Sequence, residues 1–569
     1  MSGSGETVVS RTLVALAVAA LVVTFAWRAY LVFHEPLNED ESDMLHRTWE
    51  IGHEGVLYVD TFEVRTPLLF QVARPLLWLG RPSLIYLGAR LAELLLSAAV
   101  FWFLFLFADA LAGRRAALWT VILISFFNYF AERCVQVRAE PLMLALSFAS
   151  LWQWARWRAG ERDDRAAACS GLLLGLAVMT KVSAVFVALG PAAVWFVDLL
   201  LTGEDRRRAL RGFVWWSASA VAAGVVVMVW TCGLRAGDAV TWMLRNGALF
   251  RFSETFRGGT WFVVRTFYTN PMMWLALVVG FFLLPLQLPG ARRRWTVLLL
   301  VALGWAGVIS VVARRVPFEQ DLVLPAMLFA PAGGILLARV LPLGGGRRRW
   351  LGATAAALVF AALVGFAGVE ARYHLRYAAT TIRVYEGVLA PFIGAPGPDE
   401  PARQLDGKAL MDFLRGEYDR VHYYPTRSLA QNLKLADFVA RAVPPGGVVF
   451  TDAGLAIVRP EAHHVIKASV LYYLALLEQK DTGEANCRSV RRFMPGACDP
   501  GQPPGQRLLA VLLASNPELI VFGYGVIDVI DKFPETRGWY LGGYTTWYDP
   551  AVNAFVGLRT GHGWPAKPN

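Results

Sequence analysis

Residues 34–70 carry the side chains of this chain that are best suited to chemistry. Asp40 lies near the start of the segment, and Tyr58, Asp60 and Arg65 follow it. A carboxylate can take the proton of a reacting hydroxyl group, and an arginine can bind a phosphate through paired hydrogen bonds. The segment lies between two hydrophobic stretches and is itself too polar to cross a bilayer. We therefore expect it to form an exposed loop of a membrane protein and to carry a site.

Acids are concentrated where the chain leaves the first hydrophobic stretch, at Glu35, Glu39, Asp40, Glu41 and Asp43. For most of them a solvated position beside the membrane is the ordinary interpretation. Asp40 is the exception, because the tyrosine, acid and arginine just described follow it at fixed distances. We take Asp40 as the candidate general base.

Two charged residues further along the chain are also candidates. Glu140 is expected at the outer end of a hydrophobic span, where a charge without a role is costly. The alternative is an acid that the helix dipole favours at a helix start. Lys181 is the only lysine among residues 1–407, although lysine and arginine together number 55. We favour a phosphate contact for Lys181 over a lysine that only reaches the membrane surface.

Arginines are also concentrated in a predicted outer loop, at Arg235, Arg245, Arg251, Arg257 and Arg265. Outward loops of membrane proteins are usually poor in arginine, so binding of an anion is the simplest explanation. Contact with anionic lipid headgroups is the alternative, and we prefer it for Arg235 and Arg265. The loop at 235–261 is therefore expected to bind a ligand phosphate through Arg245, Arg251 and Arg257.

Composition places these residues on a polytopic membrane protein. Of the 569 residues, 56% are hydrophobic and only 17% are charged, which is outside the range of soluble globular chains. Stretches of membrane-spanning length occur near 12–33, 84–108, 116–130, 139–157, 167–180, 182–201, 213–234, 262–287, 295–313, 322–341 and 351–369. We therefore expect a mostly α-helical bundle of about eleven spans within residues 1–370.

Basic segments predict the orientation of this bundle. They occur at 114–115, 156–165, 206–211, 292–294 and 347–349, and all five become cytoplasmic if the N-terminus is inside. The loop 34–70 and the chain after 370 then lie outside. The first stretch lacks a convincing cleavage site, so we expect it to be retained as a span. Frequent arginine, alanine and glycine indicate a bacterial source, and hence the inner membrane with the C-terminal part in the periplasm or cell-wall space.

Residues 371–569 are expected to form a separate extracytoplasmic α/β domain. Strand patterns occur at 446–458 and 517–530, and helical patterns at 428–443 and 468–479. Cys487 and Cys498 lie eleven residues apart in an outward segment, which favours a local disulfide.

The sequence implies no cofactor and no nucleic-acid partner. His34, His46, His53 and Glu63 are residue types that bind metals, but their spacing is not diagnostic, so a divalent metal ion stays open and no metal ligand is assigned. The net charge of +11 is explained by the cytoplasmic loops, and no basic and aromatic motif of nucleic-acid binding occurs.

The first outer loop resembles that of GT-C type membrane glycosyltransferases of the protein mannosyltransferase and aminoarabinose transferase kind. Asp40-Glu41 takes the place of an Asp-Glu pair, and the turn from Gly55 through Tyr58 to Asp60 that of a Gly-x-x-Tyr-x-Asp motif. The segment 65–67 corresponds to Lys-Pro-Pro, with arginine in place of lysine and threonine in place of the first proline.

The resemblance continues through the bundle. Residues 136–142, which contain Arg138 and Glu140, resemble the second acidic motif, and residues 171–181 resemble a Gly-Leu-x-x-x-x-Lys turn. A weaker match at 318–328 extends the resemblance to about residue 330. No motif of the family is found in the C-terminal domain.

The resemblance implies an enzyme that transfers a sugar from a polyprenyl-phosphate lipid to an acceptor of the cell envelope, with inversion. Asp40 corresponds to the base, and we expect Glu140 to support it. The residues expected to hold the donor phosphate are Arg65, Lys181, Arg245, Arg251 and Arg257. The residues expected to bind substrate are Glu41, Tyr58, Asp60 and Arg138.

Two other classes of protein remain as alternatives, namely a transporter or flippase of lipid-linked sugars and a non-catalytic membrane scaffold. Both would place cations near the membrane. Against a transporter, the sequence shows no internal repeat, and its candidate residues are concentrated on one side. Neutral substitution of Asp40 distinguishes the classes, because only the enzyme requires that carboxylate.

Overall fold

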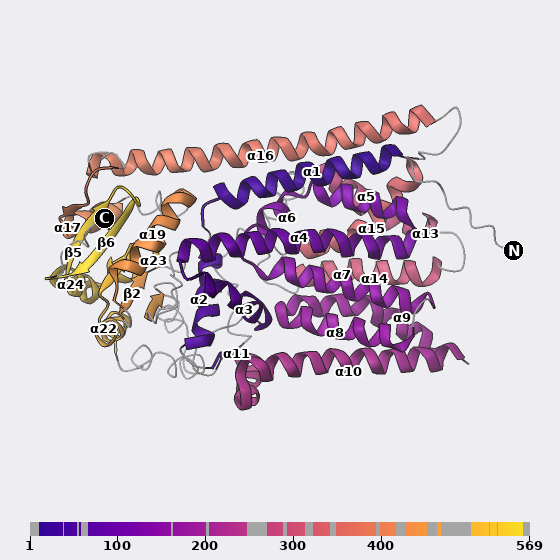
Figure 1. Cartoon of the computed structure of the whole chain (residues 1–569), viewed down its shortest axis with the longest axis horizontal. Helices are drawn as coiled ribbons and strands as arrows, with labels where there is room; N and C mark the ends of the chain where they lie inside the picture. The colour runs from indigo at the N-terminus through magenta and orange to yellow at the C-terminus, as the bar shows by residue number, and fades with distance from the viewer. Residues whose placement is uncertain are drawn as a thin grey trace.

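In the computed structural model, long helices lie side by side, and a smaller unit that contains a sheet lies beyond one end of them (Figure 1). The structure describes residues 11–561 with gaps at 38, 54–55, 59–65, 161–162, 201–203, 247–269, 288–292, 313–321, 342–348, 394–398, 417–426, 445–446, 452–463, 468–501, 523 and 532. The mostly helical bundle followed by a small α/β unit is confirmed.

Where the structure describes them, the predicted spans fall on helices of the bundle. These helices are α1 (Arg11–His34), α4 (Pro82–Ala112), α5 (Arg114–Ser125), α6 (Asn128–Arg133), α7 (Ala139–Arg158), α8 (Asp164–Thr180), η2 (Val182–Ala188), α9 (Leu189–Leu200), α10 (Glu204–Cys232), α13 (Pro271–Gln287), α14 (Arg293–Val312), α15 (Val323–Val340) and α16 (Arg349–Ile393). Within the described residues, seven helical stretches are long and apolar enough to cross a membrane.

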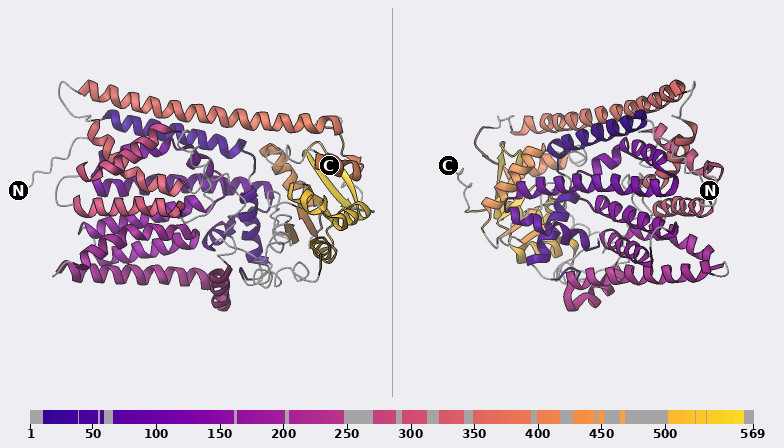
Figure 2. Two further views of the ribbon diagram at one scale, coloured as in Figure 1. Left: turned by 180° about the vertical axis from the view of Figure 1, so that it is seen from behind. Right: turned by 45° about the vertical axis from the view of Figure 1, so that its right-hand side comes forward.

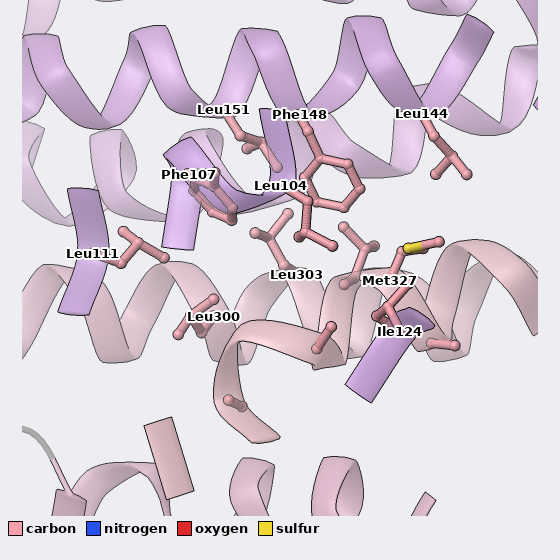
Figure 3. Packing of buried hydrophobic residues seen from close by; sticks show 14 of the residues in the cluster. Leu104, Phe107, Leu111, Ile124, Leu144, Phe148, Leu151, Leu300, Leu303 and Met327 are labelled. Atoms are coloured by element: carbon pink, nitrogen blue, oxygen red, sulfur yellow. The ribbon is translucent and has the colours of Figure 1, made fainter. Parts of the chain in front are cut away.

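The core of the bundle is aliphatic and aromatic. Figure 3 shows side chains of α4, α5, α7, α14 and α15 that point toward one another: Leu104, Phe107, Leu111, Ile124, Leu144, Phe148, Leu151, Leu300, Leu303 and Met327. Those on α4 and α7 recur every three or four residues, which places them on one face of each helix. This packing holds α4 and α7 together, and the site described below lies at one end of these two helices.

The expected span at 116–130 is divided, which corrects the prediction of one helix there. Helix α5 ends at Ser125 and α6 begins at Asn128. The carbonyl of Ser125 accepts a hydrogen bond from Thr24 Oγ1 at 2.8 Å, and that of Phe126 accepts one from Asn270 Nδ2 at 3.0 Å. Because apolar surroundings offer no water, a break inside a bundle is tolerated where side chains satisfy the freed backbone groups.

Short helices lie between the bundle and the sheet-containing unit (Figure 1). They are α2 (Glu39–His53), α3 (Leu68–Ala73), η1 (Arg74–Leu79), η3 (Gly233–Arg235) and α11 (Ala236–Asn246). Helix α2 lies within the first outer loop and is amphipathic. Its apolar residues Met44, Leu45 and Trp49 are buried.

The C-terminal unit contains a mixed sheet of order β1-β5-β6-β4-β2-β3. Its strands are β1 (Arg403–Leu405), β2 (Val448–Thr451), β3 (His464–Lys467), β4 (Leu519–Val521), β5 (Tyr544–Asp549) and β6 (Ala554–Arg559). Strand β2 pairs in parallel with β3 and β4, and the other pairs are antiparallel. Its helices are α17 (Gly407–Gly416), α19 (Leu429–Ala442), α22 (Pro504–Ser515), α23 (Tyr524–Asp531) and α24 (Pro534–Gly543).

Several predictions for this unit are confirmed. The helix expected at 428–443 is α19, and Ser428 and Gln431 form a capping box at its start. Strands begin as expected in 446–458 and 517–530, but the second strand ends at Val521 and α23 follows. The predicted helix at 468–479 and the predicted disulfide lie outside the described residues.

The C-terminal unit is joined to the bundle by α16 and by a direct contact. Helix α16 is continuous across residue 371, where we expected the C-terminal domain to begin. Ser83, at the start of α4, donates its hydroxyl and its backbone N–H to the carboxylate of Asp437 on α19, at 2.8 and 3.2 Å. In all three views α1 begins at the opposite end of the bundle (Figures 1 and 2).

Candidate active site

Four of the predicted site residues lie near one another at the end of the bundle that faces the C-terminal unit. Asp40 comes from the first turn of α2, Arg138 is the residue before α7, Glu140 is in the first turn of α7, and Lys181 directly follows α8. Residues from three separate elements are thus brought together. Two ion pairs connect them.

The first ion pair joins Asp40 and Arg138. Arg138 Nη2 lies 2.9 Å from Asp40 Oδ2; 41% of the Asp40 side chain is exposed, whereas Arg138 is buried. Arg138 Nε donates to Gln136 Oε1 at 2.8 Å, and Gln136 Nε2 donates to Glu35 Oε1 at 2.6 Å. Burial, with the positive charge of Arg133, lowers the pKa of Arg138. The hydrogen bond to Gln136 and the ion pair hold the guanidinium in a fixed direction toward Asp40, whose carboxylate is partly exposed.

The second ion pair joins Glu140 and Lys181. Lys181 Nζ lies 2.6 Å from Glu140 Oε1, and 21% of the lysine side chain but only 6% of the glutamate side chain is exposed. The pair connects the start of α7 to the end of α8. Since an ammonium group has three donors, Glu140 can orient Lys181 while the exposed part of the ammonium remains able to bind an anion.

Glu41 lies in the interior, next to Asp40 in sequence. Its two carboxylate oxygens accept hydrogen bonds from Arg90 Nε and Nη2 at 2.8 and 2.7 Å, and both side chains are fully buried. Glu41 Oε1 also accepts the backbone N–H of Val137 at 3.2 Å. Arg90 further donates to the carbonyls of Val32, Glu35 and Pro36. In this structure Glu41 therefore fixes the start of α2 against α4.

Arg90, Glu93 and Gln136 are site residues that were not predicted individually from the sequence. Arg90 and Glu93 are charged residues inside the predicted span 84–108, and a charge in a membrane span is itself a signal of a site. Gln136 was noted only as the start of the second acidic motif. Its signal is weak, because nothing in its sequence position reveals that it joins Arg138 to Glu35.

Tyr58 is fully buried and has a φ of 65°, which places it in the left-handed region. This conformation is unfavourable for a residue with a bulky side chain, so surrounding contacts must impose it. The residue before it is anchored, since the carbonyl of Leu57 accepts a contact from Cys232 Sγ at 3.6 Å. The positive φ of Tyr58 agrees with the turn predicted at the Gly-x-x-Tyr-x-Asp motif of the first outer loop.

The remaining predicted site residues cannot be placed. Asp60, Arg65, Arg251 and Arg257 lie outside the described residues, as does the side chain of Arg245, whose backbone belongs to α11. Their expected contacts with substrate and donor phosphate stay predictions. Among the described residues, no group of three His, Cys, Asp or Glu side chains is arranged to hold a metal ion.

Comparison with known proteins shows which class of protein has this fold. A family model described as dolichyl-phosphate-mannose-protein mannosyltransferase matches residues 86–231, which include Arg138, Glu140 and Lys181. The structure of ArnT from Cupriavidus metallidurans bound to undecaprenyl phosphate is 15% identical and has a TM-score of 0.58, with 97% of this chain and 99% of that chain covered.

The Archaeoglobus fulgidus oligosaccharyltransferase tethered with an acceptor peptide is also similar. It is 11% identical, with a TM-score of 0.50, and 96% of this chain and 74% of that chain are covered. No curated protein matches the sequence.

The fold is that of the GT-C membrane glycosyltransferases, and the resemblance inferred from the sequence motifs is confirmed. Within this class, the family match is to the protein mannosyltransferase type of sequence.

Proposed function

We propose that this protein is an integral membrane glycosyltransferase that transfers a sugar from a polyprenyl-phosphate donor to an extracytoplasmic acceptor with inversion. The observation that carries the proposal is the position of Asp40, Arg138, Glu140 and Lys181 at one end of a GT-C bundle. This arrangement offers an accessible carboxylate and a partly exposed ammonium within one charged cluster. A transfer from a phosphate-linked donor requires both.

Asp40 is proposed as the general base. The hydroxyl oxygen of the acceptor attacks the anomeric carbon of the donor sugar, and its proton passes to the Asp40 carboxylate. The bond between that carbon and the phosphate oxygen breaks at the same time, and its electron pair stays on the phosphate. Arg138 supports this step because it holds the carboxylate in place, and 41% of the Asp40 side chain is exposed to solvent.

Lys181 is proposed to stabilise the departing phosphate. Its ammonium is oriented by Glu140 and partly exposed at the same end of the bundle as Asp40. Negative charge that develops on the phosphate oxygen during bond cleavage is stabilised by a cation that is already in position. We assign Arg65, Arg245, Arg251 and Arg257 to the same phosphate and Asp60 to the substrate, and we assign the fully buried Tyr58 to the turn that precedes Asp60.

A lipid donor agrees with the position of the cluster. One similar structure, ArnT, is bound to undecaprenyl phosphate. In the present protein the cluster lies at the end of long apolar helices, where a lipid phosphate would meet the protein. We place this end, with the C-terminal unit, on the outer side of a bacterial inner membrane, because the basic start of α10 lies at the other end with the start of α1 (Figure 1).

Transfer from radiolabelled polyprenyl-phosphate sugars tests the proposal, with a membrane extract as acceptor source. Wild type should consume the donor, and Asp40→Asn should retain donor binding but lose transfer. Asp163→Asn is the matched control. Asp163 caps α8 near the opposite end of the bundle, and asparagine is an equally good cap.

If wild type binds the donor lipid but never consumes it, the glycosyltransferase proposal is wrong, and transport or partner binding replaces it. If Asp40→Asn transfers sugar at the wild-type rate, the enzyme class stands but the assignment of the base is overturned.

A further inference from the structure

Glu93 is a buried carboxylate that the proposed reaction has not yet used. It lies on α4, one turn after Arg90, and 3% of it is exposed. Its Oε1 accepts the backbone N–H of Arg138 at 3.3 Å. Its Oε2 is buried and has no hydrogen-bond partner among the described residues. A carboxyl group in such surroundings is costly for folding, so its presence requires an explanation.

The contact with Arg138 lies at the start of α7. Arg138 is the residue that precedes the helix, and its own side chain provides no capping hydrogen bond there. The first backbone N–H groups of a helix lack partners within it, so an acceptor from outside the helix can satisfy them. Glu93 supplies such an acceptor, a carboxyl oxygen, from a neighbouring helix. It thereby fixes the backbone at the position from which the Arg138 side chain extends.

The same backbone position is joined to the proposed base. From Arg138 the guanidinium reaches Asp40 at 2.9 Å, and the preceding residue, Val137, donates its N–H to Glu41. The start of α7 is thus held by carboxylates from two elements, α4 and α2. Removal of the α4 carboxylate would free this backbone and displace the guanidinium from the base.

We propose that Glu93 is a positioning residue for the transfer reaction, which holds the start of α7 so that Arg138 stays directed at Asp40. This inference rests on the proposed function. Glu93 touches neither the donor nor the acceptor and acts only through Arg138. Its removal should therefore slow the chemical step while the donor lipid still binds, since Lys181 holds the phosphate from another helix end.

The test compares Glu93→Ala with Glu93→Gln. In Glu93→Ala, kcat should fall on the order of 100-fold, as expected when a catalytic group is displaced by about 1 Å. The KM for the donor lipid should stay within about threefold, because binding of the ground state is unaffected. Glu93→Gln should recover most of the rate, since its amide oxygen can still accept the Arg138 N–H.

Ser97→Ala is the control on the same helix. Ser97 is fully buried one turn further on, and its hydroxyl is bonded to the carbonyl of Leu94 within α4. This variant removes a buried polar group without reaching the site, so kcat should be unchanged. In an Arg138→Ala background, Glu93→Ala should have little further effect on kcat, because the residue through which it acts has been removed.

Three outcomes overturn the inference: a wild-type kcat in Glu93→Ala, an equal loss in Glu93→Gln, or an undiminished effect of Glu93→Ala without Arg138. A structure of Glu93→Ala gives a second readout that does not depend on activity. The separation of Arg138 Nη2 and Asp40 Oδ2 should exceed hydrogen-bonding distance, and an unchanged separation refutes the role of Glu93. If wild type itself consumes no donor, the proposed function fails, and this structural readout still decides the positioning role.

Discussion

Glu140 and Lys181 show how one ion pair can serve both structure and chemistry. Each side chain stands at a helix end, and the pair is the direct link between those ends, at 2.6 Å. A pair of this kind contributes little net stability, but removal of one partner leaves the other charge buried. A variant that lacks one partner of this pair should therefore be less stable than a variant that lacks both.

Lys181→Met should lower both activity and Tm. Glu140 would be left without its cation in a mostly buried position, at a cost of about 3 kcal/mol. The double variant Glu140→Gln/Lys181→Met should recover much of the Tm but none of the activity. Thermal unfolding in detergent measures this, and a Lys181→Met protein with the wild-type Tm would show that the pair is solvated.

At the residue scale, the sequence predicted the residues that share the site better than it predicted their partners. Asp40, Glu140 and Lys181 were singled out from their types and positions, and Arg138 through the resemblance of residues 136–142 to a family motif. Arg90 could not be matched to Glu41, since the two are 49 positions apart and only the fold brings α4 against α2. Both side chains of this pair are fully buried. Their burial is likewise decided by the assembled bundle and not by the local sequence.

Helices α8 and α10 approach each other closely along a pair of glycines. A Cβ atom added at Gly171 would lie 2.0 Å from the carbonyl oxygen of Trp216, and one at Gly175 would lie 2.3 Å from that of Ala220. Small residues four apart allow membrane helices to pack backbone against backbone. The segment that resembled a family turn is thus also the packing surface that holds α8, and with it Lys181, in place.

Gly171→Ala should separate these helices and destabilise the protein by about 1–3 kcal/mol. Gly365→Ala on α16 is the control, because a Cβ there would meet no atom within 4 Å. Thermal unfolding of both variants in the same detergent gives the comparison. Equal Tm values for the two variants would contradict close packing of α8 against α10.

At the element scale, helices with long apolar patterns were predicted well, because burial in apolar surroundings fixes both their length and their composition. The break after Ser125 was not predicted. Its carbonyl groups accept hydrogen bonds from Thr24 and Asn270, which are 101 and 144 positions away, so the local sequence offers no sign of the break. Strand β4 was predicted too long for a similar reason, since the apolar residues of α23 pack against the same core.

At the scale of the whole molecule, the C-terminal unit and the bundle share one hydrophobic cluster. Met44 and Trp49 of α2 belong to it together with Leu435 and Val439 of α19. Asp437 on α19 also accepts the N–H of Ser83, at the start of α4. The helix that carries Arg90 and Glu93 is therefore capped by a residue from the C-terminal unit.

Asp437→Ala should remove this cap and loosen the C-terminal unit, at a cost of about 1 kcal/mol. Asp437→Asn should be close to wild type, since asparagine also caps helices well. Limited proteolysis of the C-terminal unit, followed over time, reports the difference. Identical cleavage rates for wild type and Asp437→Ala would show that the unit is held by its apolar contacts alone.

Helix α16 also has a mechanical consequence. It is a single helix of 45 residues, which corresponds to a length of about 68 Å. Asn128 of α6 is bonded near its middle, to Glu370 at 2.5 Å and to the carbonyl of Ala367. The half of α16 before this contact packs on the bundle through Ala356, Phe360 and Leu363, so a tilt of about 5° in the half beyond it would move the far end by about 3 Å. Such a tilt would change the height of the C-terminal unit above α2, because α16 directly precedes that unit in the chain.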